Sequence, residues 1–271
     1  MHSANDSLNL NEIRAAIFDM DGVIWRGTEI LPGVPDLFLL LQKHKIPYAM
    51  ATNNSSRNVA EYVTRFEGLG IPITDQLVIN SGAVTAEIML TKYPAGTPIY
   101  VIGSDSLVQL LTSSGYVIDP EQASVVVVGL DVSVTYDKLR IAGQRILAGA
   151  DFIGTNGDVS IPTPQGTAPG AGSILAALVA MTGKQPRLMG KPEPIMFEVV
   201  LERLGTPPPQ TLMIGDRLDT DIDGARLAGL RTALILTGVS TRADIGAIAP
   251  DGIYDDLAAL LVEWQQVLAS E

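Results

Sequence analysis

Short apolar runs alternate with helical patterns along nearly the whole chain. The runs have the composition of buried strands, and in the segments between them apolar residues recur with helical spacing. The predicted strands are Ala15–Asp19, Tyr48–Thr52, Ile99–Gly103, Ser124–Leu130, Phe152–Thr155, Thr211–Gly215 and Thr232–Leu236. The predicted helices include Val34–His44, Asn58–Leu69, Tyr136–Leu147, Ile195–Leu204 and Asp221–Ala228. This alternation predicts an α/β fold with parallel sheets and crossover helices.

The middle of the chain contains enough strands and helices to form a domain by itself. We predict a doubly wound, Rossmann-like core built from residues 1–80 and 186–271, with a smaller α/β domain at residues 81–185 inserted into it. A chain of 271 residues is long enough for two ordinary domains. The core sheet would then receive strands from both ends of the chain.

The first predicted strand ends in two carboxylates, Asp19 and Asp21, which are followed by Gly22. In open α/β sheets, ligands bind at the carboxyl ends of the strands. Two acids at that place can divide the work, one attacking or holding a metal while the other moves protons. Short acidic motifs also arise by chance or cap helices, so the pair alone is open to both interpretations.

The second predicted strand also ends in polar residues, here Thr52, Asn53 and Asn54. The Thr52 hydroxyl and the backbone N–H groups that follow it could bind an anion. Hydroxyl and amide side chains at this position also cap helices, and a helix is predicted to follow. The segment therefore favours either an anion site or an ordinary helix N-terminus.

Two later segments supply a cation and further acids. Lys191 is followed by Pro192, whose ring restricts the backbone, and a lysine held in this way is a suitable point charge for a phosphate. Most lysines, however, are simply solvated. Asp216 follows the buried strand Thr211–Gly215, and Asp221 lies one turn into the next helix. An acid near a helix N-terminus is also favourable for the helix dipole, which explains Asp221 better than Asp216.

The net charge and the absence of cysteine restrict the partners and the chemistry that we expect for this protein. The net charge of −12 argues against binding to nucleic acid or to an anionic membrane, because either would require a basic face. The absence of cysteine excludes disulfides, thiolate zinc sites and thiol catalysis. The first residues, 1–11, lack the pattern of a signal peptide, and the most hydrophobic helical run, Ala171–Met181, is too short to span a bilayer. We therefore expect a soluble, cytoplasmic protein.

Taken together, the polar segments resemble the four motifs of the haloacid dehalogenase (HAD) superfamily. The matching residues, in chain order, are Asp19-Met20-Asp21-Gly22, Thr52-Asn53, Lys191-Pro192 and Gly215-Asp216 with Asp221. Within the superfamily the chain is similar to the NagD-like and p-nitrophenylphosphatase-like phosphatases of class IIA, which carry a C2-type cap. That similarity includes Thr155-Asn156-Gly157-Asp158 and Pro169-Gly170-Ala171-Gly172 in the inserted domain.

The resemblance implies a role for each motif. Asp19 would be the nucleophile that becomes an aspartyl-phosphate, and Asp21 would protonate the leaving oxygen and later deprotonate water. Thr52 with Asn53 and Asn54 would bind the phosphate, and Lys191 would neutralise its charge.

The resemblance also implies a magnesium ion. Its ligands would be the Asp19 carboxylate, the Asp21 carbonyl oxygen and the Asp216 carboxylate, with Asp221 in a supporting role. In the cap, Asp158 would contact the leaving group, and near the nucleophile we expect Trp25 to pack beside the site rather than stack on substrate.

Other functional classes fit the sequence less well. A calcium loop needs glycine at the sixth position and glutamate at the twelfth, where Ile30 stands. A receiver-type signalling domain needs about half this length. Zinc and serine hydrolases need histidines, and the chain has only His2 and His44.

Within the family, spacing and Asp21 separate the reactions. Thr52 lies 33 positions after Asp19 (from 19 to 52), which leaves no room for the cap that sugar phosphomutases insert there. Lys191 lies 139 positions after Thr52 (from 52 to 191), which is ample for an α/β cap. The dehalogenases lack the second acid that Asp21 provides.

The prediction is a magnesium-dependent phosphomonoester hydrolase acting on a small phosphorylated metabolite. Nucleoside monophosphates, phosphoglycolate, glycerol phosphate, sugar phosphates and p-nitrophenyl phosphate are all compatible substrates. No nucleic acid or membrane partner is expected, and a homo-oligomer formed through the cap is compatible with the resemblance. The alternatives are a catalytically silent phosphate-binding protein on the same fold, and a phosphotransferase or phosphomutase.

Overall fold

The computed structural model describes residues 8–163 and 165–269. Most of the N-terminal segment searched for a signal peptide, residues 1–7, therefore lies outside the described residues. The chain divides into two compact units. The first unit comprises the described residues up to Thr52, then Ala60–Ile79, then everything from Lys191 onward, and the second comprises Asn53–Val59 and Asn80–Gly190.

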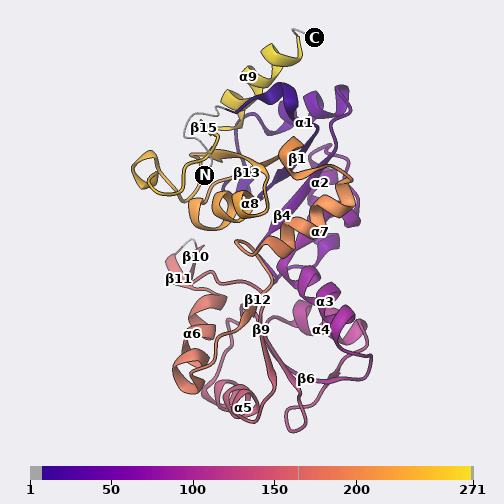
Figure 1. The fold of residues 1–271 in the computed structure, drawn as a ribbon, viewed down its shortest axis with the longest axis vertical. Coiled ribbons are helices and arrows are strands. Elements are labelled where there is room, and N and C mark those ends of the chain that lie inside the picture. The colour runs from indigo at the N-terminus through magenta and orange to yellow at the C-terminus, as the bar shows by residue number, and fades with distance from the viewer. Residues whose placement is uncertain (1–7, 164, 270–271) are drawn as a thin grey trace. The chain divides into compact units, whose positions relative to one another are not determined.

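A six-stranded sheet forms the centre of the first unit (Figure 1). Its spatial order is β15 (Gly252–Tyr254), β14 (Arg231–Ile235), β13 (Thr211–Gly215), β1 (Ala15–Phe18), β4 (Tyr48–Thr52) and β5 (Val78–Asn80). β1 runs parallel to both β4 and β13, and β14 runs parallel to both β13 and β15. The strand order reverses between β1 and β13, and such a switch point is where open α/β sheets bind ligands.

Every residue of β1 and of β13 is buried. A strand covered on both faces needs a continuous apolar run rather than an alternating one, which is what both segments provide. Phe18 at the end of β1 packs on Phe38 of α1 (Val34–Lys43), with ring centroids 4.9 Å apart. The central strands are therefore fixed by burial up to the residue that precedes the acids.

Helices cover the first sheet in two groups. α1 packs on α9 (Leu257–Leu268), and α7 (Pro194–Leu204) packs on α8 (Asp223–Leu227), on the other side of the sheet in Figure 1. The remaining elements of this unit are α2 (Val59–Gly68), the short hairpin of β2 (Trp25–Arg26) and β3 (Glu29–Ile30), the π-helical segment η4 (Leu218–Ile222), and the 3-10 segments η1 (Leu10–Glu12), η2 (Asp75–Leu77), η3 (Pro208–Gln210) and η5 (Arg242–Asp244).

The second unit contains a five-stranded sheet in which neighbouring strands are parallel. Its order is β12 (Arg187–Leu188), β9 (Asp151–Gly154), β8 (Val125–Val128), β6 (Pro98–Ile102) and β7 (Val117–Ile118). The other elements are the antiparallel pair β10 (Ser160–Thr163) and β11 (Gly166–Pro169), and the helices α3 (Ser81–Lys92), α4 (Asp105–Ser113), α5 (Tyr136–Leu147) and α6 (Ala171–Thr182). Val126, Phe152 and Leu178 lie in its hydrophobic core.

The two parallel sheets confirm the predicted α/β class. All seven predicted strands are present, two with the predicted bounds and the others with ends shifted by at most two residues. The helix predicted at Asp221–Ala228 begins earlier, because η4 leads directly into α8. The sequence did not predict the short strands β2, β3, β5, β7, β10, β11, β12 and β15, which contain two to four residues each. Such strands carry no periodicity of their own and form because a partner strand lies beside them.

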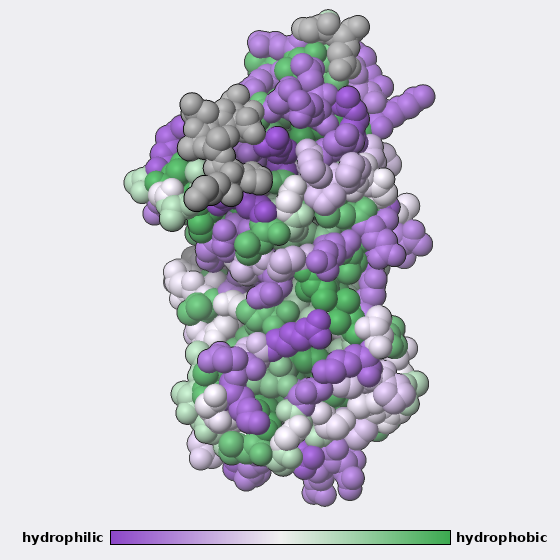
Figure 2. Space-filling model, viewed as in Figure 1, coloured by the Kyte–Doolittle hydropathy of each residue, from purple (hydrophilic) through white to green (hydrophobic). Residues whose placement is uncertain are grey.

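The face drawn in Figure 2 carries hydrophilic and hydrophobic residues intermingled. Within the part of the chain that the structure describes, no helix has the length and apolar composition needed to cross a bilayer. In particular α6, which covers the whole hydrophobic run Ala171–Met181, ends after 12 residues.

Candidate active site

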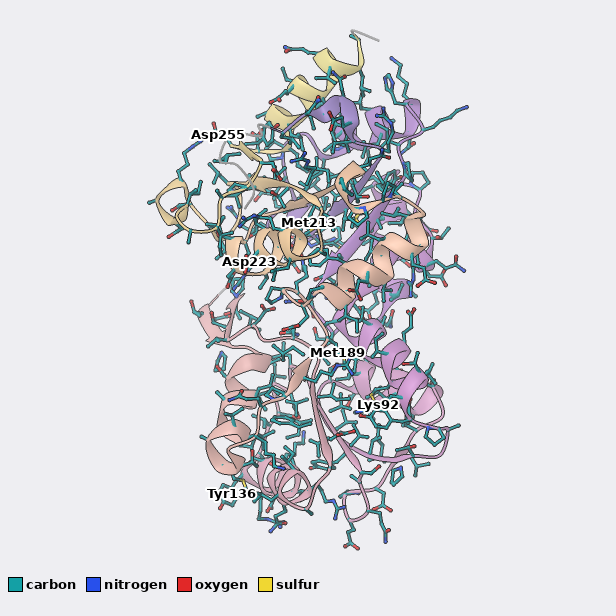
Figure 3. All side chains as sticks on the ribbon, viewed as in Figure 1. Lys92, Tyr136, Met189, Met213, Asp223 and Asp255 are labelled. Carbon is teal, nitrogen blue, oxygen red and sulfur yellow. The ribbon has the colours of Figure 1, made fainter. Side chains whose placement is uncertain are left out.

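Asp19 and Asp216 follow neighbouring strands at the switch point of the first sheet. β1 and β13 pair in register, with Phe18 opposite Ile214, and the Asp19 backbone N–H donates to the Ile214 carbonyl at 2.9 Å. The two acids therefore leave the sheet side by side. Asp221 lies in η4. The segment that carries Asp216 and Asp221 lies between Met213 of β13 and Asp223, the first residue of α8, and Figure 3 labels both of these flanking residues.

The side chains of Asp19, Asp216 and Asp221 form one buried cluster. Carboxylate oxygens of the three residues all lie within 4.8 Å of one another. Both Asp216 and Asp221 are only 1% exposed. Like charges held this close in a buried site repel one another and need a compensating cation.

Lys191 supplies part of that compensation. Its Nζ lies 2.6 Å from Asp19 Oδ1, 2.6 Å from Asp221 Oδ1 and 2.8 Å from the Ala51 carbonyl oxygen. The contacts with Asp19 Oδ1 and the Ala51 carbonyl are hydrogen bonds, and the contact with Asp221 Oδ1 is an ion pair. The side chain is 2% exposed, which excludes the interpretation of Lys191 as a solvated loop lysine.

The pKa values of Asp19, Asp216 and Lys191 differ from those of isolated side chains. Burial raises the pKa of Asp19 well above its usual range; Lys191 opposes this, while Asp221 and Asp216 add to it. Burial, followed by the charge of Asp221, raises the pKa of Asp216 to about 7. Burial alone would lower the pKa of Lys191, but Asp19 and Asp221 outweigh it and raise that pKa. One ammonium thus faces three carboxylates, and the surplus is negative.

The surplus charge and the remaining acceptors fit a metal ion. Asp221 uses Oδ1 for Lys191 and Oδ2 for the backbone N–H groups of Asp216 and Arg217, at 3.1 and 3.0 Å. Within the described residues, Asp19 Oδ2, Asp216 Oδ1 and the Asp21 carbonyl oxygen receive no hydrogen bond. Uncompensated oxygen ligands of this kind suit a hard divalent cation.

Three glycines make room for the acids. A Cβ atom at Gly238 or at Gly22 would overlap the Asp216 carboxylate, and one at Gly215 would overlap Asp221. Gly22 also has φ +93°, a conformation that disfavours other residues. The carboxylates therefore occupy space that any larger residue at these positions would fill.

The loop after β14 holds Asp216 and was missed by the sequence analysis. The Val239 N–H donates to Asp216 Oδ2 at 2.7 Å, and the Ser240 N–H donates to the Asp216 carbonyl at 3.0 Å. The Thr237 hydroxyl donates to the Gly22 carbonyl at 2.6 Å and so ties this loop to the nucleophile loop. Gly238 directly after a predicted strand was the available signal, since a glycine there often marks a close backbone approach.

Asp21 and Thr52 also belong to the first unit. Asp21 is exposed, and its Oδ1 accepts a hydrogen bond from Trp25 Nε1 at 3.0 Å. Trp25 is completely buried, so it packs beside the acids as expected. Thr52 is the last residue of β4 and is 3% exposed.

The other sequence-predicted site residues lie in the second unit. Asn53 Nδ2 donates to Asp158 Oδ1 at 3.3 Å, and the Asn156 side chain donates to the Asn53 carbonyl at 2.8 Å. Asn54 Oδ1 accepts from the backbone and the hydroxyl of Ser56, at 3.0 and 2.6 Å. The structure thus links Asn53 to Asp158, two residues that the sequence analysis proposed separately.

The raised pKa values predict how the stability of the metal-free protein depends on pH. Asp216 changes from the usual 3.8 to about 7 on folding, so its contribution is fully present below pH 3.8 and is lost as pH rises through about 7. In EDTA, the free energy of unfolding should therefore fall between about pH 4 and 7, by at most about 1.4 kcal/mol per pH unit for one proton. Urea unfolding at each pH measures it.

Asp216→Asn should make this dependence shallower, because one of the two acids with a raised pKa no longer titrates. Asp223→Asn is the matched control, since it removes an acid of α8 that lies outside the carboxylate cluster. A wild-type stability that rises across this window, or an unchanged slope in Asp216→Asn, would contradict the prediction.

Family models and relatives agree on what the chain resembles. A model described as haloacid dehalogenase-like hydrolase matches residues 16–117, and one described as HAD-hydrolase-like matches residues 188–260. The 5'-nucleotidase YutF of Bacillus subtilis is 38% identical over 226 residues, covering 83% of this chain and 88% of that protein. The acid sugar phosphatase of Staphylococcus epidermidis is 35% identical over 260 residues, covering 95% of this chain and 100% of that protein.

A solved structure extends the similarity to three dimensions. The 4-nitrophenylphosphatase of Thermotoga maritima superimposes with a TM-score of 0.88 at 35% identity, covering 93% of this chain and 98% of that one. A match of this extent includes both the Rossmann-like unit and the inserted unit. The predicted architecture of a core with an inserted cap is therefore confirmed.

Proposed function

Since the chain belongs to the haloacid dehalogenase-like hydrolase family, we propose that it is a magnesium-dependent phosphomonoester hydrolase that works through an aspartyl-phosphate on Asp19. The observation that carries the proposal is the contact between Lys191 Nζ and Asp19 Oδ1 at 2.6 Å. A buried ammonium there favours the ionised carboxylate against the effect of burial and fixes its direction, so that the second oxygen is available to attack phosphorus.

Each residue of the site has a task in the proposed reaction. Asp19 Oδ2 attacks phosphorus, the bond from phosphorus to the leaving oxygen breaks, and Asp21 gives that oxygen a proton. Water then attacks the aspartyl-phosphate, Asp21 takes a proton from it, and the bond between phosphorus and Asp19 breaks. Thr52 binds phosphate oxygens and Lys191 neutralises their charge, because phosphoryl transfer depends mainly on positioning and charge neutralisation.

The metal in this proposal is Mg²⁺, held by the Asp19 carboxylate, the Asp21 carbonyl oxygen and the Asp216 carboxylate. Mg²⁺ combines few protein oxygens with several waters, and it neutralises charge on the phosphate when bound. Asp221 is a positioning residue here, because it orients Lys191 and the backbone N–H groups of Asp216 and Arg217.

The second unit is proposed to be the cap that selects the leaving group, corresponding to residues 81–185 inserted in a core of 1–80 and 186–271. In the proposed assignment Asn53 and Asn54 bind phosphate and Asp158 contacts the leaving group. The hydrogen bond between Asn53 and Asp158 supports treating these two residues together. The relatives named 5'-nucleotidase and acid sugar phosphatase favour nucleoside monophosphates and sugar phosphates as the first substrates to test.

The test is release of inorganic phosphate from p-nitrophenyl phosphate and from a panel of small phosphorylated metabolites. We expect turnover with Mg²⁺, loss of turnover in EDTA, and recovery when Mg²⁺ is restored. Binding without turnover would instead indicate a silent phosphate-binding protein. Transfer of phosphate to an added alcohol or sugar in preference to water would indicate a phosphotransferase or phosphomutase.

A further inference from the structure

The indole of Trp25 is hydrogen-bonded to the acid that the proposed reaction uses for proton transfer. Trp25 Nε1 donates to Asp21 Oδ1 at 3.0 Å, and this is the one side-chain hydrogen bond of Asp21 within the described residues. Trp25 is completely buried, whereas Asp21 is exposed. An exposed carboxylate is thus tied at one oxygen to a buried ring.

One face of α2 holds that ring in place. Tyr62 stacks parallel to Trp25, with centroids 6.4 Å apart and an interplanar angle of 5°, and Phe66 packs at 5.1 Å. The Arg65 guanidinium carbon lies 3.7 Å from the centre of the indole, and Arg65 also donates to the Gly27 carbonyl at 2.7 Å. The three α2 residues are spaced three and four apart, so they share one helix face.

The backbone between Asp21 and Trp25 also forms a hydrogen-bonded turn. The Met20 carbonyl accepts from the N–H groups of Val23, Ile24 and Trp25 at 3.3, 2.9 and 3.2 Å, and the Gly22 N–H donates to the Trp25 carbonyl at 2.8 Å. This turn brings Trp25 back beside Asp21, four residues earlier. Both the ring and the loop that carries it are therefore constrained.

An indole N–H can donate a hydrogen bond but cannot accept one. Oδ1 of Asp21 is therefore held as an acceptor, and the proton of the acid form is placed on Oδ2. A carboxyl group whose proton sits on a defined oxygen in a defined direction is prepared for transfer, whereas a freely rotating one must first be oriented.

We propose that Trp25 is a positioning residue for proton transfer by Asp21, itself held by Tyr62, Arg65 and Phe66. The inference rests on the proposed function, because it assigns to Asp21 the proton that the leaving oxygen takes when its bond to phosphorus breaks. Trp25 touches neither substrate nor phosphate in this role. It acts only through Asp21 Oδ1.

The test compares leaving groups in wild type and in Trp25→Phe, using the magnesium-loaded full-length protein. kcat/KM is measured for aryl and primary alkyl phosphates of rising leaving-group pKa. The value of kcat/KM depends on substrate binding and on the steps through the first phosphoryl transfer. The later hydrolysis of the aspartyl-phosphate therefore does not affect it. p-Nitrophenolate leaves as a stable anion, whereas an alkoxide requires the proton from Asp21.

We expect Trp25→Phe to lower kcat/KM about tenfold to a hundredfold for alkyl phosphates, the value of a hydrogen bond to a charged group. The loss for p-nitrophenyl phosphate should be less than about threefold. A plot of log kcat/KM against leaving-group pKa should therefore be steeper in the variant. In an Asp21→Asn background, Trp25→Phe should add no further steepening.

Trp264→Phe is the matched control, because Trp264 is equally buried but lies in α9. It should leave the slope unchanged. If Trp25→Phe does not fold, replacing the Trp25 indole by benzothiophene in the Trp264→Phe background removes only the N–H donor, and the same steepening is expected.

An equal loss for all leaving groups, or an unchanged slope, would overturn the inference while leaving the proposed function standing. Absence of activity in the wild type toward every phosphate of the series would overturn the proposed function itself. The two failures are thus distinguished by the wild-type measurement alone.

Discussion

Asp19→Asn is expected to reduce phosphate release by at least about a thousandfold, as removal of a covalent nucleophile does in other enzymes. The amide has the shape of the carboxylate but lacks the charged oxygen that attacks phosphorus in the proposed reaction. It also removes one ligand of the proposed metal. Steady-state release of phosphate from p-nitrophenyl phosphate with Mg²⁺ measures the effect.

The same substitution should not destabilise the metal-free fold. It removes one of three negative charges that face the single ammonium of Lys191, and the amide oxygen can still accept from Nζ. The urea midpoint in EDTA should therefore equal or exceed that of wild type, and Asp223→Asn, the acid-to-amide control in α8, should keep full activity. Phosphate release by Asp19→Asn within tenfold of wild type would rule out Asp19 as the nucleophile.

Lys191→Met is expected to damage both activity and stability. Removing one partner of a buried ion pair leaves a buried charge unpaired and costs roughly 3–5 kcal/mol. Here two carboxylates, Asp19 and Asp221, lose the same partner. Phosphate release should fall at least about a hundredfold, because the charge that we propose neutralises the phosphate is gone.

Urea unfolding in EDTA measures the stability loss. Lys92→Met is the matched control, because Lys92 pairs with Asp151 at 2.9 Å while both side chains are half exposed, and such pairs contribute about 1 kcal/mol or less. Adding Asp19→Asn to Lys191→Met should recover part of the loss, since one unpaired carboxylate is removed. A Lys191→Met protein as stable as wild type would show that the ammonium does not compensate the carboxylates.

The long elements and the main acids could be predicted from local sequence. Ala15–Phe18 and Thr211–Gly215 are continuous apolar runs, and only a strand buried on both faces requires such a run. Acids placed directly after such runs must lie at the edge of the sheet. These acids, together with Thr52 and Lys191, carried the resemblance to the haloacid dehalogenase superfamily, and the chemistry was what that resemblance implied.

Other parts of the site had no local signal that specified a contact. Val239 binds Asp216 through its backbone N–H, which every residue except proline possesses. The carbonyl of Ala51 accepts from Lys191 for the same reason. Residues that act through the backbone cannot be recognised by side-chain type, so only their position in the fold identifies them.

The sequence by itself determined the order of the longer strands and helices, the α/β class and the acids at the ends of β1 and β13, because burial and strand geometry act on neighbouring residues. Only the tertiary structure decided that β1 and β13 are adjacent, which brings Asp19 and Asp216 together although nearly two hundred residues separate them. It also decided that Lys191 bridges two acids and that Trp25 binds Asp21. Such contacts depend on pairing and packing between distant segments, which no local pattern encodes.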